Sequence, residues 1–426
     1  MNNTSALRIR QEILPLFDRT ENSFSKEELV QVLSEPLKSK EEILSRQEIL
    51  RGFIANHDIL KDYSYSQLDF FEVYNFLASL HTKAIPKLTL MIDLQFSKER
   101  RDWARSKFIQ SVLLLNRLNH FYFKRIDARV FPESYRQELQ KIAQFLEDLN
   151  LINNERLIRE NKVRVSHIVN FMDLLTQKVT NDEHSNFWKR LFIFEAYLSI
   201  SKAIVMYGYS FPIFTENDFS FKSLYHPLLK QAVKNDITLC NNVIIFTGPN
   251  MSGKSTFLKA LGLSVYLGHL GLAVPAGAAA MPYFDSISIA INLNDDIMQG
   301  YSHFMTELKN LKQVVTDASD NRKCFAIFDE LFRGTNIEDA LHISSSTIIG
   351  LTQFNQSYFL ISTHLSQLKD MALSQENKIA AFYFDCDLQN GSPSFNYQLK
   401  KGWSELKIGK ILFDKEGLPD LLNPVK

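Results

Sequence analysis

The residues from Gly248 to Thr256, GPNMSGKST, have the types and spacing of a loop that binds phosphate, and they follow the apolar run VIIFT at residues 243–247. Glycines allow backbone N–H groups to curl around an anion, and the N-terminus of a following helix adds partial positive charge. Lys254 is placed to reach the β- and γ-phosphates of a nucleotide, and the Ser255 hydroxyl to ligate Mg²⁺. A structural turn of the same composition is the alternative. The predicted nucleotide-binding residues are Gly248, Pro249, Asn250, Met251, Ser252, Gly253, Lys254, Ser255 and Thr256.

Two carboxylates end a second apolar run, CFAIFDE at residues 324–330. Asp329 suits the Mg²⁺ site together with the loop serine, and Glu330 is placed to orient or deprotonate an attacking water. A strand that runs out into a charged loop is the alternative interpretation. A third apolar run, LISTH at residues 360–364, ends in His364. This histidine either contacts the γ-phosphate or the water, or is an ordinary loop residue.

The three apolar runs predict strands of one parallel sheet. The carboxyl ends of parallel strands meet at one edge, where α/β folds bind ligands. The sequence therefore predicts a site for ATP and Mg²⁺ where the GKS, DE and TH groups meet. Nucleotide hydrolysis is the leading hypothesis.

The elements that must position this site change in kind along the chain. Up to about residue 205, apolar residues recur at helical spacing, which predicts helices nearly throughout. After the stretch YGYSFPIFTENDF, residues 207–219, short β-rich runs alternate with helical ones. This alternation favours a mostly parallel sheet with crossover helices. We therefore predict an α plus α/β protein, with an all-helical domain at residues 1–205 and an α/β domain at residues 206–426.

Composition limits the classes of function. The 426 residues are 45% hydrophobic, and 48 basic residues balance 48 acidic ones, so no overall basic field indicates a nucleic-acid partner. Cys240, Cys324 and Cys386 each lie in or beside an apolar run, which is typical of buried thiols in a reducing compartment. The N-terminus does not resemble a secretory signal, so we expect a cytoplasmic protein.

One uncharged segment, from Ala260 to Phe284, is long enough to cross a bilayer. It contains several glycines and prolines, and it begins inside the helix expected after the phosphate loop. A buried helix and strand is the better interpretation, and no membrane partner is expected.

The helical half contains a basic region with interspersed aromatic residues: KERRDWARSK at residues 98–107 and RLNHFYFKRIDAR at residues 117–129. Such residues can hold a nucleic-acid backbone and stack on bases. The same pattern is produced by the solvated face of a long helix whose aromatics fill the core.

The loop TGPNMSGKST resembles the phosphate loop of the MutS family of DNA mismatch-repair ATPases, and further motifs of the chain resemble motifs of the same family. Tyr225-His226-Pro227 is similar to the His-Pro motif before the first ATPase strand, and GLAVPA, residues 271–276, to the strand after the first helix. SHFMTE, residues 302–307, resembles the Ser-x-Phe-Met-x-Glu segment, and DELFRGTNIEDA, residues 329–340, the DE-x-x-RGT motif. Residues 34–53, SEPLKSKEEILSRQEILRGF, are similar to the start of the family's core or lever domain.

The resemblance implies a lever domain followed by an ABC-type P-loop ATPase domain that binds ATP and Mg²⁺. It implies a homodimer in which two ATPase domains pack head to tail and each nucleotide is completed by the partner subunit. Ser302 would then contact the γ-phosphate held by the opposite subunit; a helix N-cap is its other role. The implied partners are DNA, held mostly through its backbone, and a repair protein.

Departures from the family pattern bear on the function. The mismatch-reading domain with its Phe-x-Glu wedge and the connector domain have no counterpart in these residues, and the helical half is short for a lever with a full clamp. Lys407-Ile408-Gly409 stands where the family usually has Ser-Tyr-Gly. Two hypotheses remain: an ATP-driven switch that acts on DNA, and a nucleotide-dependent protein scaffold that hydrolyses little. An ABC transporter subunit is a weaker third, because the Leu-Ser-Gly-Gly-Gln signature is absent.

Overall fold

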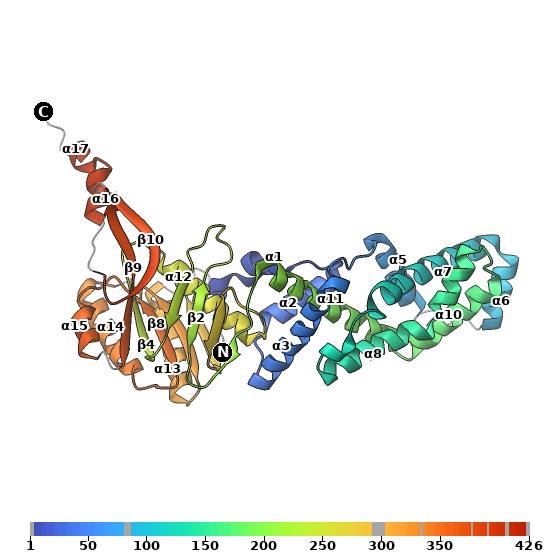
Figure 1. Cartoon of the computed structure of the whole chain (residues 1–426), viewed down its shortest axis with the longest axis horizontal. Coiled ribbons are helices and arrows are strands. Elements are labelled where there is room, and N and C mark those ends of the chain that lie inside the picture. Colours follow the sequence, from blue (N-terminus) through green and yellow to red (C-terminus); the bar gives the residue numbers. More distant parts are fainter. Residues whose placement is uncertain are drawn as a thin grey trace. The chain divides into compact units, whose positions relative to one another are not determined.

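The computed structural model describes residues 4–80, 87–291, 303–332, 335–375, 378–389, 392–404 and 409–422. The chain divides into two compact units (Figure 1). The helical unit comprises Leu16–Ser34 and Ser45–Met206. The sheet unit comprises Met1–Pro15, Glu35–Leu44 and Tyr207–Lys426. The predicted α plus α/β fold class is confirmed, since helices precede a mostly parallel sheet.

The helical unit forms as the apolar spacing predicts. Helix α7 (Lys98–Leu118) contacts α5 (Gln67–Leu80), α6 (Lys87–Phe96), α9 (Leu151–Arg159) and α10 (Val165–Thr180), and α10 also contacts α5 and α6. Its helices are α2 (Ser23–Ser34), α3 (Lys40–Ala55), which begins in the sheet unit, α4 (His57–Leu60), α5 (Gln67–Leu80), α6 (Lys87–Phe96), α7 (Lys98–Leu118), α8 (Glu133–Asp148), α9 (Leu151–Arg159), α10 (Val165–Thr180) and α11 (Glu183–Tyr207). The short turns η3 (Asn119–Phe123) and η4 (Ala128–Val130) join α7 to α8.

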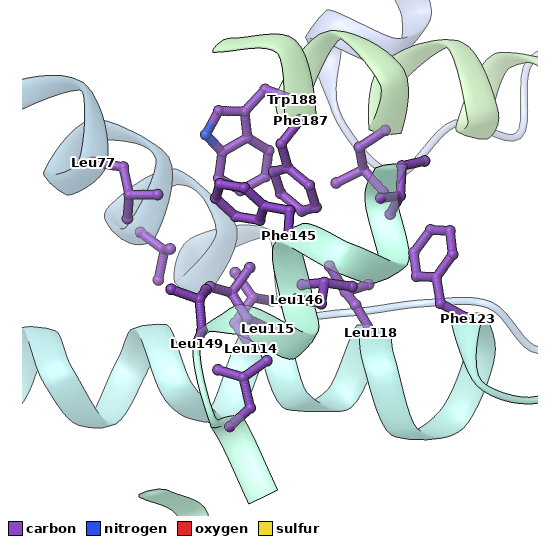
Figure 2. Packing of buried hydrophobic residues seen from close by; sticks show 14 of the residues in the cluster. Leu77, Leu114, Leu115, Leu118, Phe123, Phe145, Leu146, Leu149, Phe187 and Trp188 are labelled. Atoms are coloured by element: carbon purple, nitrogen blue, oxygen red, sulfur yellow. The ribbon is translucent and has the colours of Figure 1, made fainter. Parts of the chain in front are cut away.

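The core of the helical unit is a continuous cluster of leucines and aromatic rings. Figure 2 shows Leu115 and Leu118 of α7 near Phe145 of α8, with Phe187 and Trp188 of α11 above them. The Phe145 and Phe187 rings stack with centroids 4.3 Å apart. Each such buried side chain contributes about 1.5–3 kcal/mol of transfer free energy, so the unit has the interior of an independent domain.

A buried carboxylate links three parts of the helical unit. Glu195 of α11 is 2% exposed. Its Oε1 accepts hydrogen bonds from the hydroxyls of Tyr63 and Tyr65, each at 2.8 Å. Its Oε2 accepts from Ser25 Oγ at 2.6 Å and Asn22 Nδ2 at 2.7 Å. Burial raises the pKa of Glu195 to about 7, against the lowering effect of these hydrogen bonds.

Replacing Glu195 with alanine is expected to lower the free energy of unfolding of the helical unit by about 3 kcal/mol, because buried donors lose their shared acceptor. Urea denaturation followed by tryptophan fluorescence measures the change, since Trp188 reports on this core. Glu195→Gln keeps the side-chain volume and one acceptor oxygen, so its free energy of unfolding is expected to fall less than that of the alanine variant. A loss below about 1 kcal/mol for the alanine variant would show that the network contributes little to stability.

The main sheet of the sheet unit has the order β10-β9-β4-β8-β7-β6 within the described residues. Its strands pair in parallel, except that β10 runs antiparallel to β9. Figure 1 shows β9 and β10 as a long hairpin that leads to α16. The strands are β4 (Val243–Thr247), β6 (Ser286–Ala290), β7 (Cys324–Asp329), β8 (Tyr358–Ser362), β9 (Ile379–Gln389) and β10 (Ser392–Lys401). Central parallel strands are covered on both faces, which explains the unbroken apolar runs.

A smaller sheet of order β1-β5-β2-β3 completes the strands of this unit. Its strands are β1 (Ile213–Phe214), β2 (Ser220–Leu224), β3 (Asn235–Thr238) and β5 (Ala278–Met281). The longer helices of the unit are α12 (Lys254–His269), α13 (His303–Ser319) and α14 (Ile337–Leu351). Its short helical elements are η1 (Ser5–Leu7), η2 (Ile9–Ile13), α1 (Leu14–Phe17), which ends in the helical unit, α15 (Leu368–Ser374), α16 (Gly409–Lys415) and α17 (Leu418–Leu422).

Helix α12 lies unusually close to the main sheet. A Cβ added to Gly262 would sit 3.0 Å from the Cδ1 atoms of both Ile289 and Ile327. That separation is tighter than ordinary van der Waals contact, so glycine allows this approach. The helix that begins with Lys254 is thereby held against β6 and β7.

Two early segments belong to the sheet unit, although the predicted division places them in the helical domain. Residues 1–15 and 35–44 group with residues 207–426. The Leu37 N–H donates to the His269 carbonyl at 3.0 Å, and the Tyr283 hydroxyl donates to the Lys38 carbonyl at 2.8 Å. These contacts join residues far apart in the chain, so no local pattern could reveal them.

The uncharged segment is a buried helix and strand, as expected. The end of α12 leads through residues 271–276 to β5. The stretch GLAVPA is not itself a strand, since it contributes only an isolated bridge between Val274 and Ser210. Within the described ranges, no helix combines the length and the apolar character needed to cross a membrane.

The cysteines are free thiols, but only one is buried. Cys324 is buried, Cys386 is half-buried and Cys240 is exposed. The expectation of buried thiols is therefore wrong for Cys240, which follows β3 rather than lying within a strand. No His, Cys, Asp and Glu cluster suited to a metal ion was found among the described residues.

Candidate functional site

The three strands that carry the predicted site are neighbours in the sheet. Strand β4 pairs with β8, and β8 pairs with β7, all in parallel. Ser362 at the end of β8 is level with both Phe246 of β4 and Asp329 of β7. The loop after β4, the acidic pair after β7 and the histidine after β8 therefore emerge at one edge of the sheet.

The loop between β4 and α12 requires glycine at two positions. Gly248 has φ 136° and Gly253 has φ 98°, both in the left-handed region that other residues rarely adopt. A Cβ on Gly248 would lie 3.1 Å from Ser252 Oγ, and one on Gly253 would lie 3.2 Å from Tyr397 Cδ1. These geometries bend the chain so that α12 begins at Lys254 with its free N–H groups at the sheet edge.

Lys254 is the buried cation of the site, at 5% exposure. Its Nζ donates to the Gly248 carbonyl at 2.8 Å and to the Pro249 carbonyl at 3.0 Å. Burial lowers its pKa to about 8, although the nearby carboxylates of Glu330 and Asp329 act to raise it. A polyanion would satisfy this ammonium group better than the two neutral carbonyls.

The acidic pair is held by hydrogen bonds to β8. Ser362 Oγ donates to Asp329 Oδ1 at 2.5 Å and accepts from the Glu330 N–H at 3.0 Å. Glu330 Oε1 lies 2.8 Å from His364 Nε2, and the tautomer of the ring decides which group donates. His364 thus contacts the candidate general base directly.

A pocket of about 550 Å³ opens beside the loop. Its walls include residues of the loop, Glu330, Tyr225, His226 and Leu229. Burial lowers the pKa of His226, and the Lys259 charge acts in the same direction. The volume lies in the range of small-molecule sites.

The residues present fit a nucleotide. Ser252 is 1% exposed, and its Oγ has no hydrogen-bond partner among the described residues. A phosphate in the loop would give this orphaned hydroxyl an acceptor. Across the loop, Lys254, Ser252 and Pro249 are buried, Ser255, Gly248 and Gly253 are half-buried, and Asn250, Met251 and Thr256 are exposed.

Two residues of the site are not among those predicted from the sequence. Ser362 precedes Thr363 and His364, and its buried hydroxyl links the acidic pair to β8. Tyr397 lines the pocket from β10, where the pairing with β9 shifts register between Phe395 and Leu399. In the sequence, Ser362 is indicated only by its place in the apolar run before His364. No sequence signal indicates Tyr397.

Several predicted residues lie outside the described ranges. Ser302, the predicted contact to the partner's nucleotide, is one of them. Arg333-Gly334 of the DELFRGTNIEDA motif and Lys407-Ile408 also fall there. Phe304 to Glu307 are described and lie in the first turns of α13.

In the basic region of the helical unit, residues 98–107 and 117–129, some side chains lie in the core and others lie at the surface. Its buried aromatics include Phe108, Tyr122 and Phe123, whereas Trp103 is 51% exposed and Phe121 is 49% exposed. Several of its cations have partners within the unit: Arg100 with Asp93, Lys107 with Glu72, Arg105 with Asn161 and Arg129 with Asp127. The core interpretation accounts for the first group of aromatics and leaves Trp103 and Phe121 available at the surface.

A parallel sheet, a glycine loop at a helix N-terminus and an acidic pair at the end of a second strand of the same sheet define a domain of the ATPase type. Comparison with known sequences gives the family: a model of MutS domain V matches residues 244–422. Residues 244–422 are therefore a MutS domain V, and the family is shown for this part of the chain.

Several bacterial DNA mismatch repair proteins MutS are similar to this chain. The protein of Petrotoga mobilis is 26% identical over 344 residues, which cover 75% of this chain and 41% of the relative. That of Leuconostoc mesenteroides is 34% identical over 220 residues, covering 50% of this chain and 26% of the relative. The protein of Thermus thermophilus is 29% identical over 228 residues, which cover 53% of this chain and 27% of the relative. The chain therefore matches less than half the length of these relatives.

Proposed function

We propose that this chain is an ATP-binding and ATP-hydrolysing switch of the MutS family that acts on DNA as a nucleotide-dependent dimer, in mismatch repair or related DNA maintenance. The observation that carries the proposal is the meeting of the β4, β8 and β7 ends at one sheet edge. The family match and the ATPase-type fold support it.

The loop residues bind the nucleotide in this proposal. Lys254 exchanges its bonds to the Gly248 and Pro249 carbonyls for the β- and γ-phosphates, because a charged acceptor is the stronger partner. Ser252 Oγ gains an acceptor. Tyr225 and His226 line the same pocket as the loop, and they are the proposed contacts to the nucleoside.

The residues after β4 and β7 hold the metal and the water. Ser255 and Asp329 are the proposed Mg²⁺ ligands, and the ion supplies charge neutralisation on the phosphates when bound. Glu330 orients the attacking water and accepts its proton. His364, 2.8 Å from the Glu330 carboxylate, fixes the direction of that carboxylate.

The action on DNA rests on the family and on the helical unit. The relatives are DNA mismatch repair proteins by name. Exposed Trp103 and Phe121 are suited to contact with the DNA backbone and bases, and the Arg117 guanidinium lies over the Phe121 ring. In the proposed dimer Ser302 contacts the nucleotide of the opposite subunit, and a repair protein is a further partner.

A protein scaffold that hydrolyses little ATP is the second candidate. The balance of 48 basic and 48 acidic residues favours it, as do the internal partners of the basic region. Such a protein would still bind ATP, but its binding to DNA would be weak and independent of nucleotide.

A DNA-binding titration with and without ATP separates the two candidates. On homoduplex, mismatched and branched DNA, we expect affinity to depend on ATP and to fall with rising salt as counterions are released. Fluorescence anisotropy across several salt concentrations measures it, with Lys254→Ala as the control that should lose the ATP dependence. If none of the three DNAs binds, the scaffold becomes the function best supported.

A further inference from the structure

The turn after β7 carries an unusual backbone. Glu330 has φ 57° and Phe332 has φ 63°, so two residues other than glycine adopt left-handed geometry within three positions. A bulky residue in that region is strained and persists only where surrounding contacts determine it. Phe332 is fully buried, and its ring meets that of Phe304 with centroids 5.9 Å apart.

One side of this turn is held from β8. The Glu330 N–H donates to the Ser362 carbonyl at 3.2 Å and to Ser362 Oγ at 3.0 Å. The same hydroxyl donates to Asp329 Oδ1. Ser362 is fully buried, so water cannot replace these bonds.

The other side is held from α13. The Phe332 N–H donates to Glu307 Oε2 at 2.9 Å, and Glu307 is 6% exposed. A buried carboxylate that accepts a backbone N–H forms one of the stronger hydrogen bonds in proteins. Helix α13 packs on β6 and β7, so it presents this carboxylate from a rigid element.

We propose that Glu307 and Ser362 are positioning residues for Glu330: they hold the strained turn at its two ends, Phe332 and Glu330, and so fix the Glu330 carboxylate beside the phosphate loop. This inference rests on the proposed ATP hydrolysis. Neither residue touches the nucleotide in this scheme, and each acts through the backbone of residues 329–332.

Hydrogen exchange tests the clamp without nucleotide. In Glu307→Ala and in the shorter Glu307→Asp, exchange of the Phe332 amide is expected to be about tenfold faster or more, because its buried acceptor is lost or withdrawn. Glu307→Gln keeps an acceptor oxygen and should retain protection. Unchanged exchange in the alanine and aspartate variants would overturn the proposal, whatever the outcome of nucleotide assays.

Single-turnover kinetics with the full chain then separate positioning from binding. We expect Glu307→Ala and Ser362→Ala to reduce the hydrolysis rate about tenfold or more while the Kd for ATP changes little, and Glu307→Gln to restore the rate. Ser344→Ala is the matched control, since Ser344 is buried in α14 and its hydroxyl has no hydrogen-bond partner among the described residues.

The outcomes distinguish this inference from the proposed function. A wild-type protein that hydrolyses ATP, with variants that hydrolyse at the same rate, overturns the clamp alone. A wild-type protein that binds no ATP overturns the proposed function, while hydrogen exchange still decides whether Glu307 holds the turn. If Glu307→Ala does not fold, Glu307→Asp and Ser362→Ala carry the test.

Discussion

Lys254→Ala is expected to abolish ATP binding at nucleotide concentrations that saturate the wild type. The ammonium group is buried at the phosphate loop and bonded to two carbonyls that a phosphate would replace. Loss of charge-assisted hydrogen bonds in such a site costs about 3 kcal/mol, or roughly a hundredfold in affinity. Isothermal titration calorimetry with ATP and Mg²⁺ measures it.

The burial of Lys254 also makes ATP affinity depend on pH. Its pKa in the free protein is lowered to about 8, against an ordinary value of 10.5. Above pH 8 the free protein has lost this proton, and ATP must bind together with a proton. The affinity for ATP should therefore fall about tenfold for each pH unit above pH 8. Just below pH 8, it should not change with pH.

Lys259→Ala is the control for both measurements. It removes an equal charge from the same helix, and Lys259 is not part of the pocket wall described above. Its ATP affinity above pH 7.5 and the fall in that affinity above pH 8 should stay close to those of the wild type, because the Lys259 charge acts on His226, whose pKa is lowered below its usual range. If Lys254→Ala binds ATP as the wild type does, the phosphate-loop assignment is wrong.

Glu330→Gln is expected to keep ATP binding and to slow hydrolysis about a hundredfold or more, the usual contribution of a general base. Glutamine has the same size but cannot accept the proton of the attacking water. It can still hydrogen-bond to His364 in one orientation. Single-turnover hydrolysis of labelled ATP measures the rate, and a fluorescent ATP analogue measures affinity.

The same variant tests the proposed dimer. If ATP closes two subunits together and hydrolysis opens them, Glu330→Gln should accumulate as a dimer in ATP, visible by sedimentation velocity. Glu338→Gln, an exposed position in the first turn of α14, is the control and should behave as the wild type. Hydrolysis by Glu330→Gln at near the wild-type rate would assign the base to another residue.

The sequence by itself predicted three strands of the main sheet and placed the candidate site residues at their ends. The apolar runs around Val243, Cys324 and Tyr358 became β4, β7 and β8, because strands covered on both faces of a parallel sheet must be apolar throughout. The polar residues that follow these strands could be predicted to lie close together, because the carboxyl ends of parallel strands meet at one edge of the sheet. Helical spacing likewise predicted helices nearly throughout residues 1–205, the region that contains α2 to α11.

Only the tertiary structure decided how these pieces meet. Residues 35–44 pack with the sheet unit, Tyr397 reaches the loop from the β9–β10 hairpin, and Glu307 accepts from the Phe332 N–H. Each of these contacts joins residues distant in sequence. Local periodicity describes which face of an element is apolar, but a hydrogen bond to a strained backbone N–H depends on how whole elements pack.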